Sequence, residues 1–83
     1  NQPLSRRFVV KNEELTRRVV AIVKETTQAK HVNEYSTVDN VPNWDSLAYM
    51  TVVAAVEDEF KIQVNQENIT EFDSVEKIVK ILS

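Results

Sequence analysis

The sequence predicts an all-α domain, a small bundle of three main helices plus one short helix with a long loop between the first two. Apolar residues recur at helical spacing in separate segments, and no stretch alternates apolar and polar residues as a half-buried strand would. The chain has 83 residues, of which 42% are hydrophobic and 28% charged. These values suit one small folded domain and leave no room for a second.

The first predicted helix follows an N-terminal segment with no clear pattern. Asn12 is a plausible N-cap, and Glu13 and Glu14 in the first turn suit the positive end of the helix dipole. The core stripe of this helix comprises Leu15, Val19, Ile22, Val23 and Thr26. We therefore expect residues 12–83 to form the domain and residues 1–11 to be an extension, a linker or an added helical turn.

A long connection from about Gln28 to Trp44 joins the first two helices. Pro42 disfavours the helical conformation at the residue before it and so marks the end of this loop. Its scattered apolar anchors are Val32, Tyr35, Val38 and Val41. Loops of this length in compact domains are usually packed and functional.

The second helix opens at Asn43-Trp44-Asp45-Ser46-Leu47 and extends to Phe60, with two apolar faces. The expected core face is Tyr49, Val52, Val53, Val56 and Phe60. The second face, close to Ser46, is Leu47, Met50, Thr51 and Ala54. A helix that is apolar on two sides is either buried all round or keeps one face for a partner. In so small a domain we favour the second interpretation.

Two further segments complete the bundle. A short helical turn around residues 66–72 lets Ile69 and Phe72 reach the core. Asp73-Ser74-Val75-Glu76 has the pattern of a capping box that opens a last helix. The core stripe of this helix is Val75, Ile78, Val79 and Leu82.

The net charge of −3 is unevenly distributed. Residues 1–33 carry seven Lys/Arg and three Asp/Glu, whereas residues 34–76 carry one Lys and ten acids. An acidic surface repels the nucleic-acid backbone and attracts basic partners, so we expect no nucleic-acid binding. For Glu57-Asp58-Glu59, at the end of the second helix, we favour a solvated turn over a loose site for a divalent cation or a basic partner.

Several kinds of chemistry are disfavoured. No cysteine is present, which excludes disulfides, thiolate metal sites and a cysteine nucleophile. His31 with Ser46 and Asp45 is a poor hydrolytic triad, because adjacent residues cannot easily act as nucleophile and orienting acid and no glycine offers an oxyanion hole. No apolar run is long enough to span a membrane. Arg6-Arg7 lacks the long apolar region of an export signal, so we expect a cytoplasmic protein. Because none of these catalytic arrangements fits, we also expect that the protein is not an enzyme.

Ser46 is the main candidate functional residue. It follows Asp45 at the first turn of a helix, where its hydroxyl should face solvent and added negative charge is favoured. On local residues alone, either residue could merely cap the helix. A first helix and a long loop precede a second helix, which opens with Asp-Ser-Leu and ends in Glu-Asp-Glu-Phe. This order of elements resembles the acyl carrier protein family over roughly residues 12–82.

The resemblance implies a function. In this family the serine receives 4′-phosphopantetheine from coenzyme A through a phosphopantetheinyl transferase, and the thiol of the arm carries acyl groups as thioesters. By position, Ser46 is the modified residue, and Asp45 helps to dock the transferase and its metal. The implied partners are the transferase and acyl- or aminoacyl-loading and processing enzymes, and we expect a monomer. The alternative from another class is a small helical interaction module that is never modified.

The sequence also departs from the carriers of fatty-acid synthesis. Those commonly have acids two and five residues after the serine, where this chain has Ala48 and Thr51. Asn43-Trp44 replaces a frequent Gly-Ala and looks more like stand-alone carriers of specialised pathways or of amino-acid-derived cargo. We therefore expect a more apolar docking face. Its residues are Leu47, Met50 and Ala54, rimmed by Glu57 and Asp58.

Overall fold

Four helices build the part of the chain that this computed structural model describes, which is the backbone of residues 4–83 and the side chains from residue 13 onward. They are α1 (Leu4–Thr27), α2 (Ser46–Phe60), α3 (Gln66–Ile69) and α4 (Val75–Leu82). Between residues 4 and 83 there is no strand, and the sole bridge pairs Thr37 with Ser74. The predicted all-α bundle of three main helices and one short helix is confirmed.

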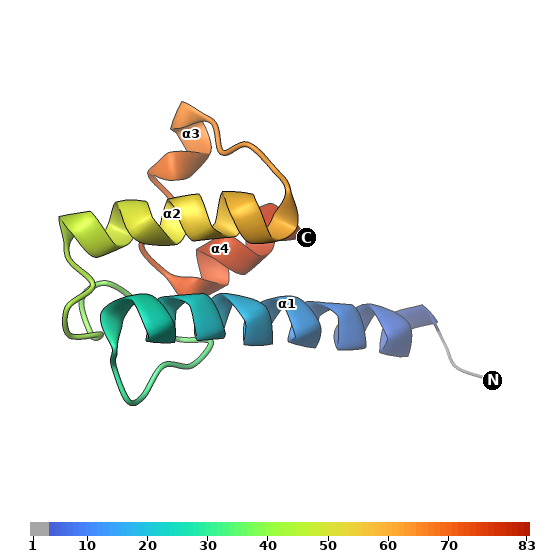
Figure 1. Cartoon of the computed structure of the whole chain (residues 1–83). Helices are drawn as coiled ribbons and strands as arrows, with labels where there is room; N and C mark the ends of the chain where they lie inside the picture. The colour runs from blue at the N-terminus through green and yellow to red at the C-terminus, as the bar shows by residue number, and fades with distance from the viewer. Residues whose placement is uncertain (1–3) are drawn as a thin grey trace.

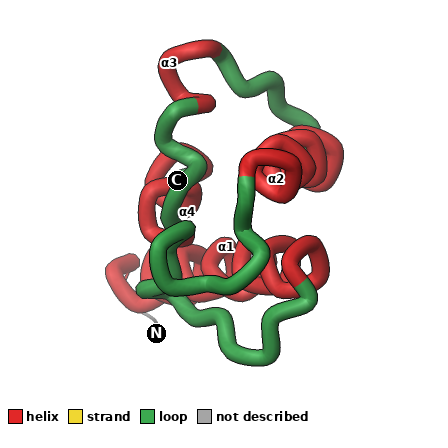
Figure 2. Tube along the Cα trace, turned by 90° about the vertical axis from the view of Figure 1, so that its left-hand side faces the viewer, coloured by secondary structure: helices red, strands yellow, loops and turns green. Residues whose placement is uncertain are grey.

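The three longer helices pack around a shared core. α2 runs antiparallel to α1, and α1 contacts both α2 and α4 (Figure 1). In the view down the bundle, α1, α2 and α4 surround the centre while α3 lies at the far end from α1 (Figure 2). No helix within the described residues combines the length and apolar character needed to cross a bilayer.

Small branched side chains fill the core, and they come from the helix faces that the spacing predicts. Val19 and Val23 of α1 meet Val52 and Val56 of α2, and all four are completely buried. The segment after α3 and the start of α4 add Phe72, Val75 and Ile78, which are also completely buried. Burial of each such side chain contributes roughly 1.5–3 kcal/mol relative to exposure. The core stripes predicted for the three main helices are therefore confirmed except at Thr26, in whose place the neighbouring Thr27 is buried.

Two predicted helix caps are wrong. α1 begins at Leu4, so Asn12 lies inside the helix and does not cap it. No Gly or Pro separates these two residues, and nothing in that stretch interrupts the backbone hydrogen bonds. At α4, the Ser74 hydroxyl alone caps the helix by accepting from the N–H of Lys77, at 3.1 Å. A capping box needs its acid at the Lys77 position, and Glu76 comes one residue too early.

The middle of the loop between α1 and α2 is held by hydrogen bonds to the rest of the fold. The Val38 N–H donates to the Asp73 carbonyl, and the Val75 N–H donates to the Ser36 carbonyl, each at 3.0 Å. These bonds attach the loop to the start of α4. Tyr35 was expected to anchor the loop, but its side chain is 65% exposed. A tight turn, in which the Asn33 side chain accepts from the Tyr35 N–H, leaves the ring on the outside.

Candidate functional site

Ser46 is the first residue of α2, and it is exposed. Asp45 is the N-cap: its Oδ1 accepts from the Ala48 N–H at 2.9 Å, and its carbonyl accepts from the Tyr49 N–H. Within the described chain, the N–H groups of Ser46 and Leu47 have no acceptor. An exposed hydroxyl beside free N–H groups at the positive end of a helix fits a phosphodiester.

The residues around Ser46 fix its position. Trp44 and Ala48 on either side are buried in the core, so the chain between them must face outward. Asn43 adopts a left-handed conformation with φ of 71°, and its side-chain amide donates to the Thr27 carbonyl at the end of α1. Thr27 is itself buried, although the sequence pattern favoured Thr26. The start of α2 is thereby tied to the end of α1.

The second apolar face of α2 remains uncovered. Leu47 is 78% exposed and Met50 is 50% exposed, whereas Thr51 and Ala54 are small and also exposed. Nothing in the described part of the chain packs over this face. The residues of the predicted docking face therefore lie together on the surface, directly after Ser46.

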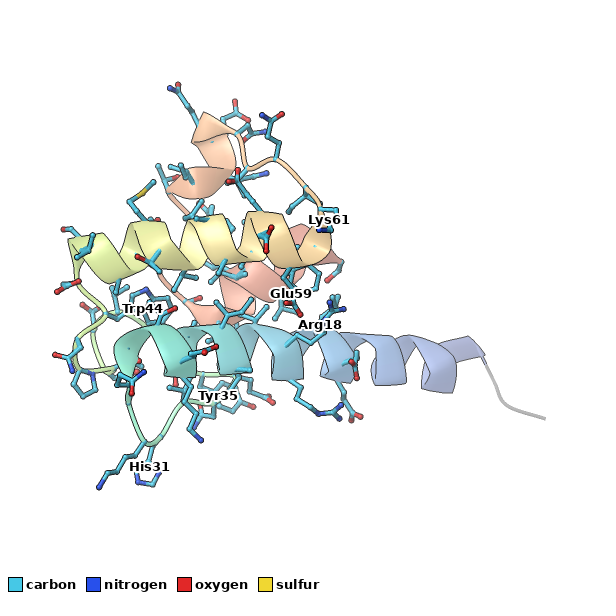
Figure 3. All side chains as sticks on the ribbon, viewed as in Figure 1. Arg18, His31, Tyr35, Trp44, Glu59 and Lys61 are labelled. Carbon is cyan, nitrogen blue, oxygen red and sulfur yellow. The ribbon has the colours of Figure 1, made fainter. Side chains whose placement is uncertain are left out.

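The three acids at the end of α2 have different surroundings. Glu57 is half-buried, and its Oε2 accepts from the Val64 N–H at 2.8 Å, which fixes the connection to α3. Glu59 pairs with Arg18 of α1 at 3.0 Å, and the Arg18 guanidinium lies 4.4 Å from the centre of the neighbouring Phe60 ring (Figure 3). Asp58 is exposed. Within the described residues, no group of three His, Cys, Asp or Glu side chains could hold a metal ion.

His31 does not take part in a catalytic arrangement with Ser46. It lies exposed on the loop after α1, on the opposite side of α1 from α2 (Figure 3). The only hydrogen bond of the Asp45 side chain in the described structure goes to the Ala48 N–H. The rejection of a hydrolytic triad is therefore supported by the geometry.

A groove of about 450 Å³ adjoins Ser46. Its lining residues are Val38, Trp44, Asp45, Ser46, Tyr49 and Met50. The Tyr49 hydroxyl donates to the Ile69 carbonyl and accepts from the Phe72 N–H at 3.1 Å, so it joins α2 to the segment after α3. Burial raises the pKa of Tyr49 above its ordinary value of 10.0. Helical spacing placed Tyr49 on the core face but gave no sign of this cross-link, because both partners are backbone groups.

The fold and the site define a small helical domain with an exposed serine at a helix start. Residues 44–82 match the protein family described as the phosphopantetheine attachment site. The match begins at Trp44 and takes in Ser46 and all of α2, α3 and α4. No curated protein matches the chain. The match supports a carrier protein, with a covalently attached 4′-phosphopantetheine as the cofactor.

Proposed function

We propose that this chain carries acyl or aminoacyl intermediates as thioesters on a 4′-phosphopantetheine arm attached to Ser46, and presents them to biosynthetic enzymes. The observation that carries the proposal is the exposed Ser46 hydroxyl at the first position of α2, inside the segment that matches the family. An attachment residue must reach the active site of another protein. The start of α2 offers that access.

The other aliphatic hydroxyls in residues 44–82 are engaged in the fold. Thr51 donates to the Leu47 carbonyl and Thr70 donates to the Glu67 carbonyl, each at 2.9 Å. Ser74 is buried and caps α4. Ser46 alone among them makes no hydrogen bond within the described structure and is open to solvent. Elimination therefore supports Ser46 independently of the Asp-Ser-Leu motif.

The modification needs a base that this chain does not supply. In the reaction, the Ser46 Oγ forms a bond to the phosphorus that bears the pantetheine in coenzyme A, and the phosphoanhydride bond to the adenosine half breaks. The proton of the Ser46 hydroxyl must pass to a base. The neighbouring Asp45 carboxylate faces the Ala48 N–H, so we assign the base to the transferase. In this proposal the chain is a substrate and a carrier, not an enzyme.

Partner docking is assigned to the exposed face of α2. Leu47 and Met50 offer apolar contact area, and Ala54 lets a partner approach closely. The acidic rim would be Glu57 and Asp58, of which Glu57 is partly engaged by the Val64 N–H, and Asp45 would help to dock the transferase. The predominance of apolar over charged side chains close to Ser46 favours a carrier of a specialised pathway. We further propose that the protein is monomeric and cytoplasmic, and that residues 12–83 form the domain and residues 1–11 an extension.

The test is the intact mass of the chain before and after incubation with coenzyme A and a permissive phosphopantetheinyl transferase. We expect a gain of one phosphopantetheine, which Ser46→Ala abolishes and the matched control Thr51→Ala keeps. Circular dichroism establishes that both variants are folded. No gain with several transferases, or a gain that persists in Ser46→Ala, would refute the assignment. The first of these results would favour the unmodified interaction module.

A further inference from the structure

The segment that contains α3 is attached to α2 by side-chain hydrogen bonds at two points. Before α3, the Val64 N–H donates to the Glu57 carboxylate at 2.8 Å. After α3, the Tyr49 hydroxyl donates to the Ile69 carbonyl and accepts from the Phe72 N–H at 3.1 Å. We call this second attachment the Tyr49 link. The two attachment points are about two turns apart on α2, so α3 can move away from α2 only when one of them breaks.

Core side chains occupy the space that this segment encloses with α2. Val52, Val53 and Phe72 belong to one cluster, and each is at most 3% exposed. Ile69 packs against the same cluster. No residue of α3 or α4 lines the groove beside Ser46, so this groove does not continue between α2 and α3.

A cargo attached through Ser46 can lie either in water or inside the bundle. An apolar cargo gains free energy by leaving water in proportion to its apolar area. To pass between α2 and α3 it would have to displace packed side chains and break the Tyr49 link. The Ile69 carbonyl and the Phe72 N–H would then lose the Tyr49 hydroxyl as a partner, which costs free energy. A short or polar cargo has too little apolar area to offset these costs.

We propose, on the basis of the proposed attachment at Ser46, that this chain keeps its cargo outside the helical bundle because the Tyr49 link holds α3 against α2. The cargo then stays in contact with water whenever no enzyme is bound. A long saturated acyl chain would expose its whole apolar surface in that position. The cargo class that suits this chain is therefore a short or polar one, an aminoacyl group or a short acyl group. Tyr49 acts as a positioning residue for α3.

An octanoyl group is a suitable probe, because its apolar surface favours burial wherever the bundle can admit it. A permissive transferase would attach octanoyl-phosphopantetheine from octanoyl-coenzyme A, and intact mass would verify the loading. Hydroxylamine cleaves an accessible thioester into a hydroxamate and a free thiol. We expect the loaded chain and free octanoyl-pantetheine to be cleaved at rates within about threefold of each other, whereas a cargo buried in the bundle would be cleaved at least about tenfold more slowly.

Nuclear Overhauser effects locate the octanoyl chain directly. In the wild type, its methylene groups should show none to the Phe72 ring or to the Val53 methyl groups. Tyr49→Phe keeps the aromatic ring but removes the Tyr49 link, so the octanoyl chain should now contact Phe72 and be cleaved at least about threefold more slowly than in the wild type. Thr51→Ala, which removes an exposed hydroxyl from the same helix, should behave as the wild type does. Circular dichroism establishes that both variants are folded.

The outcomes separate this inference from the proposed function. No gain in mass from either coenzyme A or octanoyl-coenzyme A overturns the attachment at Ser46 and this inference with it. Octanoyl contacts to Phe72, or slow cleavage, in the loaded wild type overturn the exclusion of cargo and leave the attachment standing. A folded Tyr49→Phe variant that behaves as the wild type overturns the role of the Tyr49 link. The measurements on the wild type do not depend on this variant.

Discussion

The two faces of α2 have similar apolar side chains but opposite surroundings. Val52 and Val56 are completely buried against α1 and the α4 region, whereas Leu47 and Met50 are 78% and 50% exposed. Both pairs lie within the same four turns of helix. The two pairs differ in the direction of their side chains on the helix, not in their apolar character.

This contrast shows how one short helix can serve the fold and a partner at the same time. A domain of 83 residues buries a small core, so each buried valine has a large share in its stability. The exposed face contributes little to folding and is free to be recognised. Substitutions on α2 should therefore divide into those that change stability and those that change function.

The largest expected effect is on the core face. Val56→Ala removes two methyl groups from a completely buried position, so the free energy of unfolding should fall by about 2–3 kcal/mol. Met50→Ala, on the exposed face, should change it by less than about 0.5 kcal/mol. Urea denaturation followed by circular dichroism measures both values.

For the rate of phosphopantetheinylation, we expect the opposite order of effects from Val56→Ala and Met50→Ala. Met50→Ala should lower the kcat/KM of the transferase for this chain by about tenfold if Met50 is a central contact. Val56→Ala should leave it unchanged at a temperature where the variant is folded. If the two variants lost equal stability, the exposed face would have to be covered in solution, and the division between the faces would fail.

Tyr49, which is half-buried on the core face, should have the next largest effect. Tyr49→Phe removes the acceptor of the Phe72 N–H and the donor to the Ile69 carbonyl, which should cost about 1–3 kcal/mol. Burial raises the pKa of Tyr49 in the folded chain, so the unfolded chain releases its proton first as the pH rises. The stabilisation is therefore complete below about pH 10 and decreases above it.

Unfolding free energies measured at several pH values from neutral to about 11 test this dependence. The difference between the wild type and Tyr49→Phe should be constant up to about pH 9 and should narrow above pH 10. A difference that stayed constant throughout would show that the Tyr49 hydroxyl does not titrate differently in the folded and unfolded chains.

Asp45 caps α2 and is also predicted to help dock the transferase. Two substitutions at this position distinguish the two roles. Asp45→Ala removes the cap of α2 and should cost about 1 kcal/mol. Asp45→Asn keeps an oxygen that can accept from the Ala48 N–H and should restore most of that stability. If the carboxylate also helps to dock the transferase, both variants should be modified more slowly. Full modification rates in Asp45→Asn would leave Asp45 only its role as a cap.

Helix faces could be predicted from the sequence because a period of 3.6 residues is local information. This periodicity gave the buried stripe of α1 and both faces of α2, and the family pattern pointed to Ser46. The groove could not be predicted, because it depends on Val38 and Trp44 being brought together by a loop whose anchors attach to α4. The predicted cap at Asn12 was wrong because a residue type that favours the N-cap position can also lie within a helix.

The left-handed positions were also beyond sequence reasoning. Chains usually place glycine where φ is positive, and this chain contains none. Gln28, Asn43 and Lys61 take these positions instead, with φ of 60°, 71° and 57°. Two of them end helices α1 and α2, and the third precedes Trp44. Of these residue types only Asn commonly adopts this conformation, so the sequence did not indicate a positive φ at Gln28 or Lys61.

The smallest predicted effect follows from Lys61, which ends α2 in the left-handed conformation while its N–H donates to the Glu57 carbonyl. Lys61→Gly removes the steric cost of a side chain there, which outweighs the greater freedom of glycine in the unfolded chain. The free energy of unfolding should rise by about 0.5 kcal/mol. Lys61→Val, with a β-branched side chain, should lower it by about 1 kcal/mol. Thermal unfolding of both variants should therefore move in opposite directions, and modification at Ser46, at the other end of α2, should be the same in each.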